Sequence, residues 1–152
     1  MNSNTWIMAF DYGDMRIGVA IANTTLKIPH PVAIVTGRNK FEKLDKIAKL
    51  VEEWRPSQLI VGTPTKREDN ELLINNIRKF SNRLTHKFKL PLTFINEDYT
   101  SSIASIKLNE QSIRGFAQKT KVDALAACLI LQMYLEKPLE KLDTVSQDGN
   151  PR

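Results

Sequence analysis

The sequence predicts a single α/β domain with a five-stranded mixed sheet and helices on both faces. Short, almost continuously apolar runs predict buried strands, and apolar residues at helical spacing predict amphipathic helices. After the third predicted strand, strands and helices alternate along the chain. Because crossovers between parallel strands are right-handed, this order makes the first three strands antiparallel and the later strands parallel to the first.

The first half of the chain predicts a hairpin followed by a third strand. Residues 5–11 form an apolar run, and the turn after it contains Gly13, which is free to adopt positive φ. Residues 16–22 then alternate in size. The large residues are Ile17, Val19 and Ile21, and the small residues between them are Gly18, Ala20 and Ala22. The small face leaves room for a closely packed helix. Residues 23–31 predict a loop, and residues 32–35 a short strand.

The second half predicts helices at 40–54 and around 73–84, with strands at 58–62 and 92–96. Thr100 is positioned to cap a short helix that ends near Leu108. Residues 121–135 predict a largely buried helix, which Pro138 ends. The expected domain spans residues 1–138, and residues 139–152 predict a flexible tail because they lack a core-forming pattern.

The composition of the chain indicates its class of partner and its cellular compartment. The 152 residues carry a net charge of +5, which favours a polyanionic partner such as nucleic acid. Cys128 is the single cysteine, so the chain forms no internal disulfide, which agrees with a reducing cytoplasm. Cys128 lies in an apolar helical pattern and is expected to be a core residue. With no secretory signal and no long apolar run, the sequence predicts a cytoplasmic protein without a membrane span.

Three acids stand at the ends of apolar segments. Asp11 closes the first strand, Glu97 follows the fifth, and Asp123 opens the last helix. Buried acidic groups are costly unless a positive charge lies among them. If these three meet at one edge of the sheet, they make a site for Mg²⁺ or Mn²⁺. Such a site on a basic protein suggests phosphodiester chemistry.

Four segments together resemble the YqgF (RuvX-like) family of RNase H-like proteins. These are Phe10–Ala20 with the pattern D-x-G-x-x-R-I-G-V-A, Leu59–Pro64 with V-G-x-P, Asn96–Ser101, and Lys121–Ala127 with Ile130–Gln132. The match runs in order over roughly residues 6–135. Each segment is a weak signal alone, and the four together are specific.

The resemblance implies an RNase H-like fold and a metal-dependent nuclease. Members of the family are described as pre-16S rRNA nucleases or as Holliday-junction-resolvase-like proteins. Asp11, Glu97 and Asp123 match the family's acids and would hold one or two Mg²⁺ ions, with cleavage leaving a 5′-phosphate and a 3′-hydroxyl. The implied partner is nucleic acid, either pre-rRNA in a ribosomal particle or a DNA junction. Monomer and homodimer both remain open.

The chain departs from the family pattern at the third motif. Asp98 stands where the family has arginine, and Asn96 stands where it has an acid. Asn23, after the second strand, is likewise an amide in place of an acid. Asp98 would either repel the substrate phosphate or add a metal ligand, so it is a candidate modifier of activity.

Basic residues near these motifs are candidates for contacts with the substrate backbone, which position a nucleic acid without reading its sequence. They are Arg16, Lys66, Arg67, Arg114, Lys119 and Lys121. Each is also compatible with an ordinary solvated surface charge. Tyr12 and Tyr99 could stack on bases, although packing at the rim of the core is the expected role.

Other interpretations stay open for the acids and for the whole chain. Asp11 could accept hydrogen bonds within its turn, Glu97 could be a surface residue, and Asp123 could act only on the helix dipole. A D-x-G hairpin also occurs in ATPases of the actin and sugar-kinase type, which usually need two such domains. A catalytically weak RNA-binding module is the second alternative, and Asp98 is its main support.

Overall fold

The computed structural model describes residues 5–64, 71–96 and 122–136. The elements in chain order are β1 (Trp6–Asp11), β2 (Ile17–Asn23), β3 (Pro29–Val35), α1 (Lys40–Trp54), β4 (Gln58–Thr63), α2 (Glu71–Phe88), β5 (Leu92–Asn96) and α5 (Val122–Glu136). All five predicted strands and the three helices predicted in these residues are present. Structural expectations for residues 98–120 and for the tail at 139–152 lie outside the described residues.

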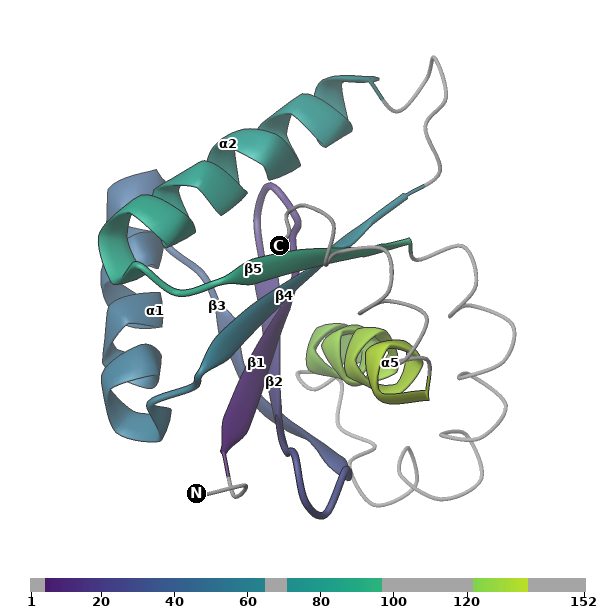
Figure 1. The fold of residues 1–152 in the computed structure, drawn as a ribbon. Helices are drawn as coiled ribbons and strands as arrows, with labels where there is room; N and C mark the ends of the chain where they lie inside the picture. The colour runs from purple at the N-terminus through teal and green to yellow at the C-terminus, as the bar shows by residue number, and fades with distance from the viewer. Residues whose placement is uncertain (1–4, 65–70, 97–121, 137–152) are drawn as a thin grey trace.

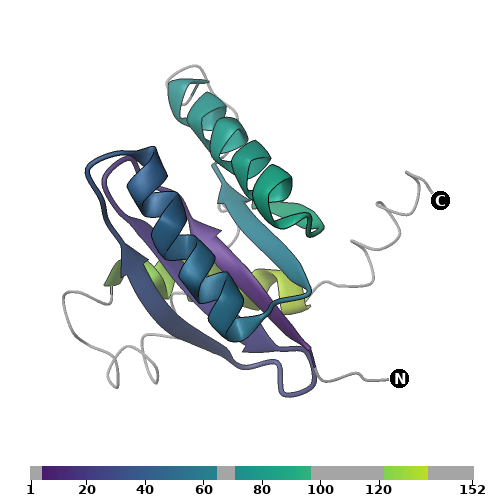
Figure 2. The same cartoon turned by 90° about the vertical axis from the view of Figure 1, so that its left-hand side faces the viewer.

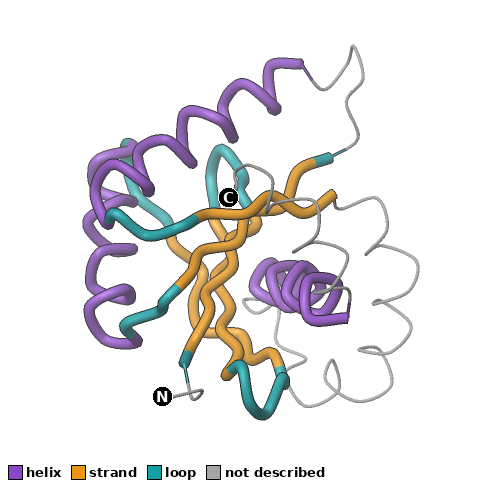
Figure 3. The backbone as a smooth tube through the Cα atoms, in the orientation of Figure 1, coloured by secondary structure: helices purple, strands orange, loops and turns teal. Residues whose placement is uncertain are grey.

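The five strands form one mixed sheet with the order β3-β2-β1-β4-β5. β1 and β2 pair antiparallel, as do β2 and β3, whereas β4 is parallel to both β1 and β5. Helices α1 and α2 cover one face and α5 covers the other (Figures 1 and 3). The prediction of a mixed sheet with three antiparallel strands and helices on both faces is confirmed.

The alternation in β2 divides the core into two layers. Ile17, Val19 and Ile21 join the cluster beneath α1 and α2, which also contains Phe10 and Phe80. The rings of Phe10 and Phe80 meet edge to face, with their centroids 5.8 Å apart. Strand β1 is almost completely buried in this arrangement, as expected for a central strand.

In the opposite layer, β2 presents small side chains to the helix. Ala20 and Ala22 of β2 pack with Ala127 and Cys128 of α5, and all four are at least 98% buried. A helix therefore packs closely on the small-residue face of the second strand, as predicted. Figure 2 shows α5 crossing behind the sheet, on the side away from α1.

Local signals explain the ends of α1. The Asn39 side chain accepts a hydrogen bond from the Glu42 N–H at 2.9 Å, which satisfies one of the free donors of the first turn. At the other end, Arg55 takes the left-handed conformation with φ of 49°, and its N–H donates to the Val51 carbonyl. Pro56 follows and cannot continue the helix.

The third strand is longer than the sequence predicted. β3 begins at Pro29 rather than residue 32, so the predicted loop over 23–31 is reduced to residues 24–28. The register shifts opposite Val19 and Ala20, where Val32 has no direct partner, which is a bulge in β3. Prolines at 29 and 31 argued against a strand in the sequence. An edge strand nevertheless tolerates proline, because one of its sides makes no ladder hydrogen bonds.

Cys128 is a buried core thiol, as predicted. Desolvation raises its pKa from 9.0 to about 12, so the neutral thiol is favoured in the fold. The contribution of the Cys128 thiol to the free energy of unfolding is present below pH 9 and is lost as the pH rises from 9 toward 12.

We expect the stability difference between wild type and Cys128→Ala to shrink over that pH range, in urea unfolding experiments at pH 7 to 11. A thiol reagent at pH 8 should label only the unfolded protein. Rapid labelling of the native protein would contradict this assignment.

None of the helices that the structure describes has the length and apolar character needed to cross a membrane.

Candidate active site at the carboxyl edge of the sheet

Asp11 is the last residue of β1 and lies half-buried at the carboxyl end of that strand. It directly follows Phe10, which is completely buried and anchors the strand between the two layers. Asp11 pairs with Gly18 in the β1–β2 register. The carboxylate is thus carried on a rigid strand end, which is where open parallel sheets place functional groups.

Two further strands end at the same edge. β4 is parallel to β1 and β5 is parallel to β4, so their last residues, Thr63 and Asn96, lie beside each other and on the same side as Asp11. Glu97 is the next residue after Asn96. Its side chain lies outside the described residues, but the strand that leads to it is directed to this edge.

The last helix runs away from this edge, toward the start of β4. The Tyr134 hydroxyl donates to Gln58 Oε1 at 3.2 Å, which fixes the C-terminal part of α5 at the start of β4. Fifteen residues make a helix about 22 Å long. Its first turn, which contains Asp123, therefore lies far from the start of β4. The side chain of Asp123 is outside the described residues.

The structure describes the side chain of one of the three predicted acids, Asp11. Within residues 5–64, 71–96 and 122–136, no group of three acids, histidines or cysteines is placed to hold a metal ion. Two of the three predicted ligands contribute no described side chain, so the metal site remains a prediction. The backbone supports it because the paths of β1 and β5 lead to one edge.

The turn after Asp11 is tighter than a flexible glycine loop. Gly13 has no positive φ, contrary to the expectation from sequence. Glycine is needed there for a different reason, since a Cβ at this position would lie 2.6 Å from the Arg16 carbonyl oxygen. The Lys43 ammonium also donates to the Asp14 carbonyl, which ties the hairpin tip to α1.

Tyr12 packs at the rim of the core, which is the expected role. Its ring lies 5.0 Å from that of Phe80, at an interplanar angle of 41°. Burial raises the pKa of the Tyr12 hydroxyl, and the nearby charge and hydrogen bond of Asp14 raise it further, while Arg83 lowers it. The hydroxyl donates to Asp14 Oδ1 at 3.4 Å and stays protonated at neutral pH.

A basic cluster surrounds Tyr12, consisting of Lys40 and Lys43 from α1 and Arg83 from α2. Sequence reasoning missed these three residues, because α1 and α2 are far apart in the chain. One signal was present: lysines near a helix N-terminus oppose the helix dipole, so their placement there costs some stability. A cavity of about 30 Å³ beside them has room for one water molecule and no ligand.

The sequence-predicted contacts with nucleic acid are placed only in part. Arg16 is exposed at the end of the hairpin turn, next to Ile17 of β2, and interacts with other groups of the protein. The remaining predicted residues, and the modifier position, lie outside the described residues: Lys66, Arg67, Asp98, Arg114, Lys119 and Lys121.

Asn23 has a structural role at the opposite edge of the sheet. It pairs with Trp6, the first residue of β1, and is 5% exposed. Its Oδ1 accepts hydrogen bonds from the N–H groups of Thr25 at 2.9 Å and Leu26 at 3.2 Å. The amide at this position closes a turn about 17 Å from the level of Asp11, so it has no direct bearing on the proposed site.

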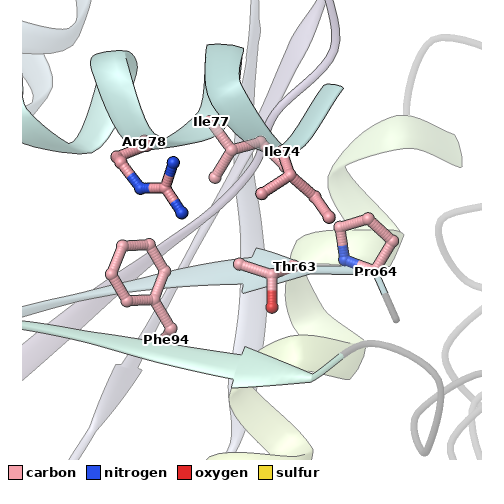
Figure 4. A pocket seen from close by; sticks show the side chains of 6 residues that line it. All are labelled: Thr63, Pro64, Ile74, Ile77, Arg78 and Phe94. Atoms are coloured by element: carbon pink, nitrogen blue, oxygen red, sulfur yellow. The ribbon is translucent and has the colours of Figure 1, made fainter. Parts of the chain in front are cut away.

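A larger cavity lies on the α2 side of the same carboxyl edge, with a volume of about 220 Å³. Figure 4 shows Arg78 of α2 and Phe94 of β5 facing each other across it, with Thr63 and Pro64 at one end. Pockets for drug-sized ligands usually measure about 300–1,000 Å³. This cavity is too small to enclose a whole nucleoside triphosphate.

Comparison with known proteins gives the family. Residues 5–137 match the model of the family described as RuvX, Holliday junction resolvase. The chain belongs to the RuvX family. A protein of Chromobacterium violaceum named "Putative pre-16S rRNA nuclease" is 43% identical over 133 residues, which cover 86% of this chain and 97% of that protein. One of the same name from Neisseria gonorrhoeae is 40% identical over 130 residues, with 85% and 86% covered.

Solved structures support the fold of this RuvX family member. Thermus thermophilus RuvC in complex with a Holliday junction substrate matches with a TM-score of 0.63 at 12% identity, covering 90% of this chain and 96% of that one. The fowlpox virus Holliday junction resolvase matches with a TM-score of 0.55 at 19% identity, covering 86% and 98%. At these identities the likeness shows the fold, and it confirms the predicted RNase H-like architecture. Nucleases such as those named in this family are hydrolases acting on ester bonds.

Proposed function

We propose that this protein is a divalent-metal-dependent nuclease that processes the 5′ end of pre-16S rRNA in the cytoplasm, during ribosome biogenesis. The observation that carries the proposal is the position of Asp11, at the end of β1 and on the edge where β4 and β5 also end. The names of the relatives and the family support a nuclease. The net charge of +5 favours a polyanionic substrate.

The proposed metal ligands are Asp11, Glu97 and Asp123. Carboxylate oxygens are suitable ligands for Mg²⁺ and Mn²⁺. Asp11 lies at the end of a strand that packing holds in place. Glu97 follows β5 and Asp123 stands in the first turn of α5, so the backbone is compatible with the set. When bound, the metal supplies Lewis acidity and lowers the pKa of a coordinated water.

Side chains around this edge would hold the metal ion and position the substrate. Asp11 adds the negative charge that holds the ion, and the hairpin keeps this carboxylate in position. Lys40, Lys43 and Arg83 form a positive surface next to Tyr12, where they would hold the phosphates that flank the scissile bond. Such contacts position a nucleic acid backbone and carry no sequence information, which agrees with a substrate chosen by its shape.

Cleavage of a four-way DNA junction is the second candidate. The description of the matching family favours it, since that description is Holliday junction resolvase. Symmetric junction cleavage requires two active sites related by a two-fold axis, so this function predicts a homodimer. The rRNA function is compatible with a monomer or with a homodimer.

Parallel assays separate these functions. We expect wild type with Mg²⁺ to cleave a pre-16S rRNA fragment faster than a four-way DNA junction, and Asp123→Asn to cleave neither at a measurable rate. The readout is product formation on denaturing gels, with Mn²⁺ tested alongside. Equal residual cleavage by wild type and Asp123→Asn would mean that the site is wrong or that the activity is a contaminant.

Other outcomes, with binding and ATP hydrolysis measured alongside, would each identify a different function. Tight RNA binding without cleavage at any Mg²⁺ or Mn²⁺ concentration would identify a binding module. Binding and slow hydrolysis of ATP would instead favour the ATPase interpretation. Preference for the junction, together with a dimer in solution, would establish the second candidate function.

A further inference from the structure

The cavity beneath α2 has chemistry that the proposed cleavage site does not use. It lies between α2 and the carboxyl halves of β4 and β5, at the same edge as Asp11 but on the other face of the sheet. Six described residues line it, namely Thr63, Pro64, Ile74, Ile77, Arg78 and Phe94. In Figure 4, the side chains of Ile74, Ile77 and Arg78 point down from the helix, and the Phe94 ring points up from β5.

Phe94 is unusually exposed for a residue on the face of the sheet that α1 and α2 cover. The next residue, Ile95, packs under α5 and is 6% exposed, so Phe94 faces the α2 layer, yet 47% of it remains exposed. The buried stripe of α2 is Ile77, Phe80 and Leu84, and it leaves the carboxyl half of β5 partly open. A large aromatic ring is therefore presented to solvent on the edge strand.

Arg78 adds a planar cation to the aromatic face. Its Nη1 donates to Asn75 Oδ1 at 3.1 Å, and among the described residues its other donors have no recorded partner, so they can reach a ligand. Figure 4 shows this guanidinium over the same cavity that the Phe94 ring lines. An aromatic ring and an arginine plane are the groups on which proteins stack unpaired bases.

The size and position of the cavity restrict its occupant. A volume of about 220 Å³ is below the usual range for drug-sized ligands and suits one planar ring system. Phe94 is in register with Val61, and Val61 with Phe10. With strands about 4.8 Å apart, the Phe94 backbone lies on the order of 10 Å from the end of β1, but its ring lies on the face of the sheet opposite to the one that Ile7, Ala9 and Asp11 share.

We propose that this cavity binds an unpaired nucleobase of the substrate, stacked on Phe94 and bordered by Arg78, at some distance along the strand from the bond that is cut. This inference rests on the proposed function for the identity of the substrate. The apolar walls from Ile74 and Ile77 exclude water from the faces of the base. Arg78 and the positive net charge favour a nucleic acid over an apolar peptide.

The test measures binding without cleavage. A single-stranded RNA oligonucleotide and a fully paired duplex of the same sequence are titrated without divalent ions, by fluorescence anisotropy. We expect Phe94→Ala and Phe94→Leu to weaken binding of the single strand about tenfold to a hundredfold, because each removes the stacking ring. Phe94→Trp should retain affinity, and duplex binding should be unchanged.

Two controls make the result specific. Leu72→Ala removes another exposed apolar side chain of α2 that does not line the cavity, and it should change affinity less than about twofold. Replacing single bases of the RNA with abasic sites should reveal one position whose loss weakens wild type but not Phe94→Ala. Circular dichroism melting confirms that each variant is folded.

Several outcomes would overturn the base-binding cavity. These are wild-type affinity in Phe94→Ala, equal losses on single strand and duplex, wild-type affinity in Phe94→Leu, or no measurable binding of single strands by wild type. Retention of single-strand affinity in Phe94→Leu would show that apolar contact, and not stacking on an aromatic ring, binds the RNA. Because no divalent ion is present, a protein that binds single strands through Phe94 but cleaves nothing leaves this inference standing and refutes the nuclease proposal.

Discussion

Replacing Asp11 with asparagine is expected to reduce phosphodiester cleavage by at least about a hundredfold without unfolding the protein. Asparagine has nearly the same shape as aspartate, so the strand end in which Asp11 pairs with Gly18 should be preserved. The substitution removes a negative charge from the metal site. Metal assistance contributes several kcal/mol of transition-state stabilisation, and each 1.36 kcal/mol corresponds to tenfold in rate. The measurement is the initial rate on the pre-16S fragment at saturating Mg²⁺.

Asp14→Asn is the matched control for this effect. Asp14 is an acid in the same hairpin, exposed to solvent, and its side chain accepts a hydrogen bond from Tyr12. Its charge lies outside the proposed metal ligands, so cleavage should change less than about threefold. Titration of both variants with Mn²⁺ should show weaker metal binding only for Asp11→Asn. Equal rates for Asp11→Asn and wild type would remove Asp11 from the site.

The fold was predictable because its signals are local and agree with one another. Continuous apolar runs marked β1 and β4, and the alternation of large and small residues in β2 predicted both layers of the core. Helix α1 begins and ends where Asn39 and Pro56 indicate. The misjudged start of β3 shows the limit of local reasoning, since Pro29 and Pro31 are acceptable only because that strand is at the edge.

The surroundings of the site could not be predicted in the same way. Arg83 meets Lys40 and Lys43 only after α1 and α2 pack side by side, and no local pattern encodes that meeting. The cavity at Phe94 likewise depends on how far α2 extends over β5. Strand-end acids were recognisable because strand polarity decides which edge they reach. Of these acids, the structure describes the side-chain surroundings of Asp11 alone.

Gly13 shows how the hairpin backbone sets the position of the site. We expect Gly13→Ala to lower the free energy of unfolding by about 1–3 kcal/mol, because the new Cβ would lie 2.6 Å from the Arg16 carbonyl oxygen. Both atoms belong to a backbone that is tied to strands on each side, so the hairpin must shift. Asp11 precedes Gly13 by two residues and should move with it.

A displaced carboxylate should cost activity beyond the loss of stability. Misplacement of a catalytic group by about 1 Å can reduce the rate a hundredfold, so cleavage by the folded Gly13→Ala protein should fall between tenfold and a hundredfold. Urea unfolding and cleavage rates at a temperature where the variant is folded separate the two effects. A variant with wild-type stability and activity would show that the hairpin absorbs the methyl group freely.

Gly37→Ala is the control that distinguishes backbone contact from ordinary crowding. A Cβ at Gly37 would lie 3.1 Å from Lys43 Cγ and 3.2 Å from two side-chain atoms of Glu42. These are atoms of half-exposed side chains of α1, which can move by the few tenths of an ångström required. Gly37→Ala should therefore leave cleavage within about twofold of wild type. Equal loss of activity in both variants would indicate that the hairpin contact at Gly13 has no special role in holding Asp11.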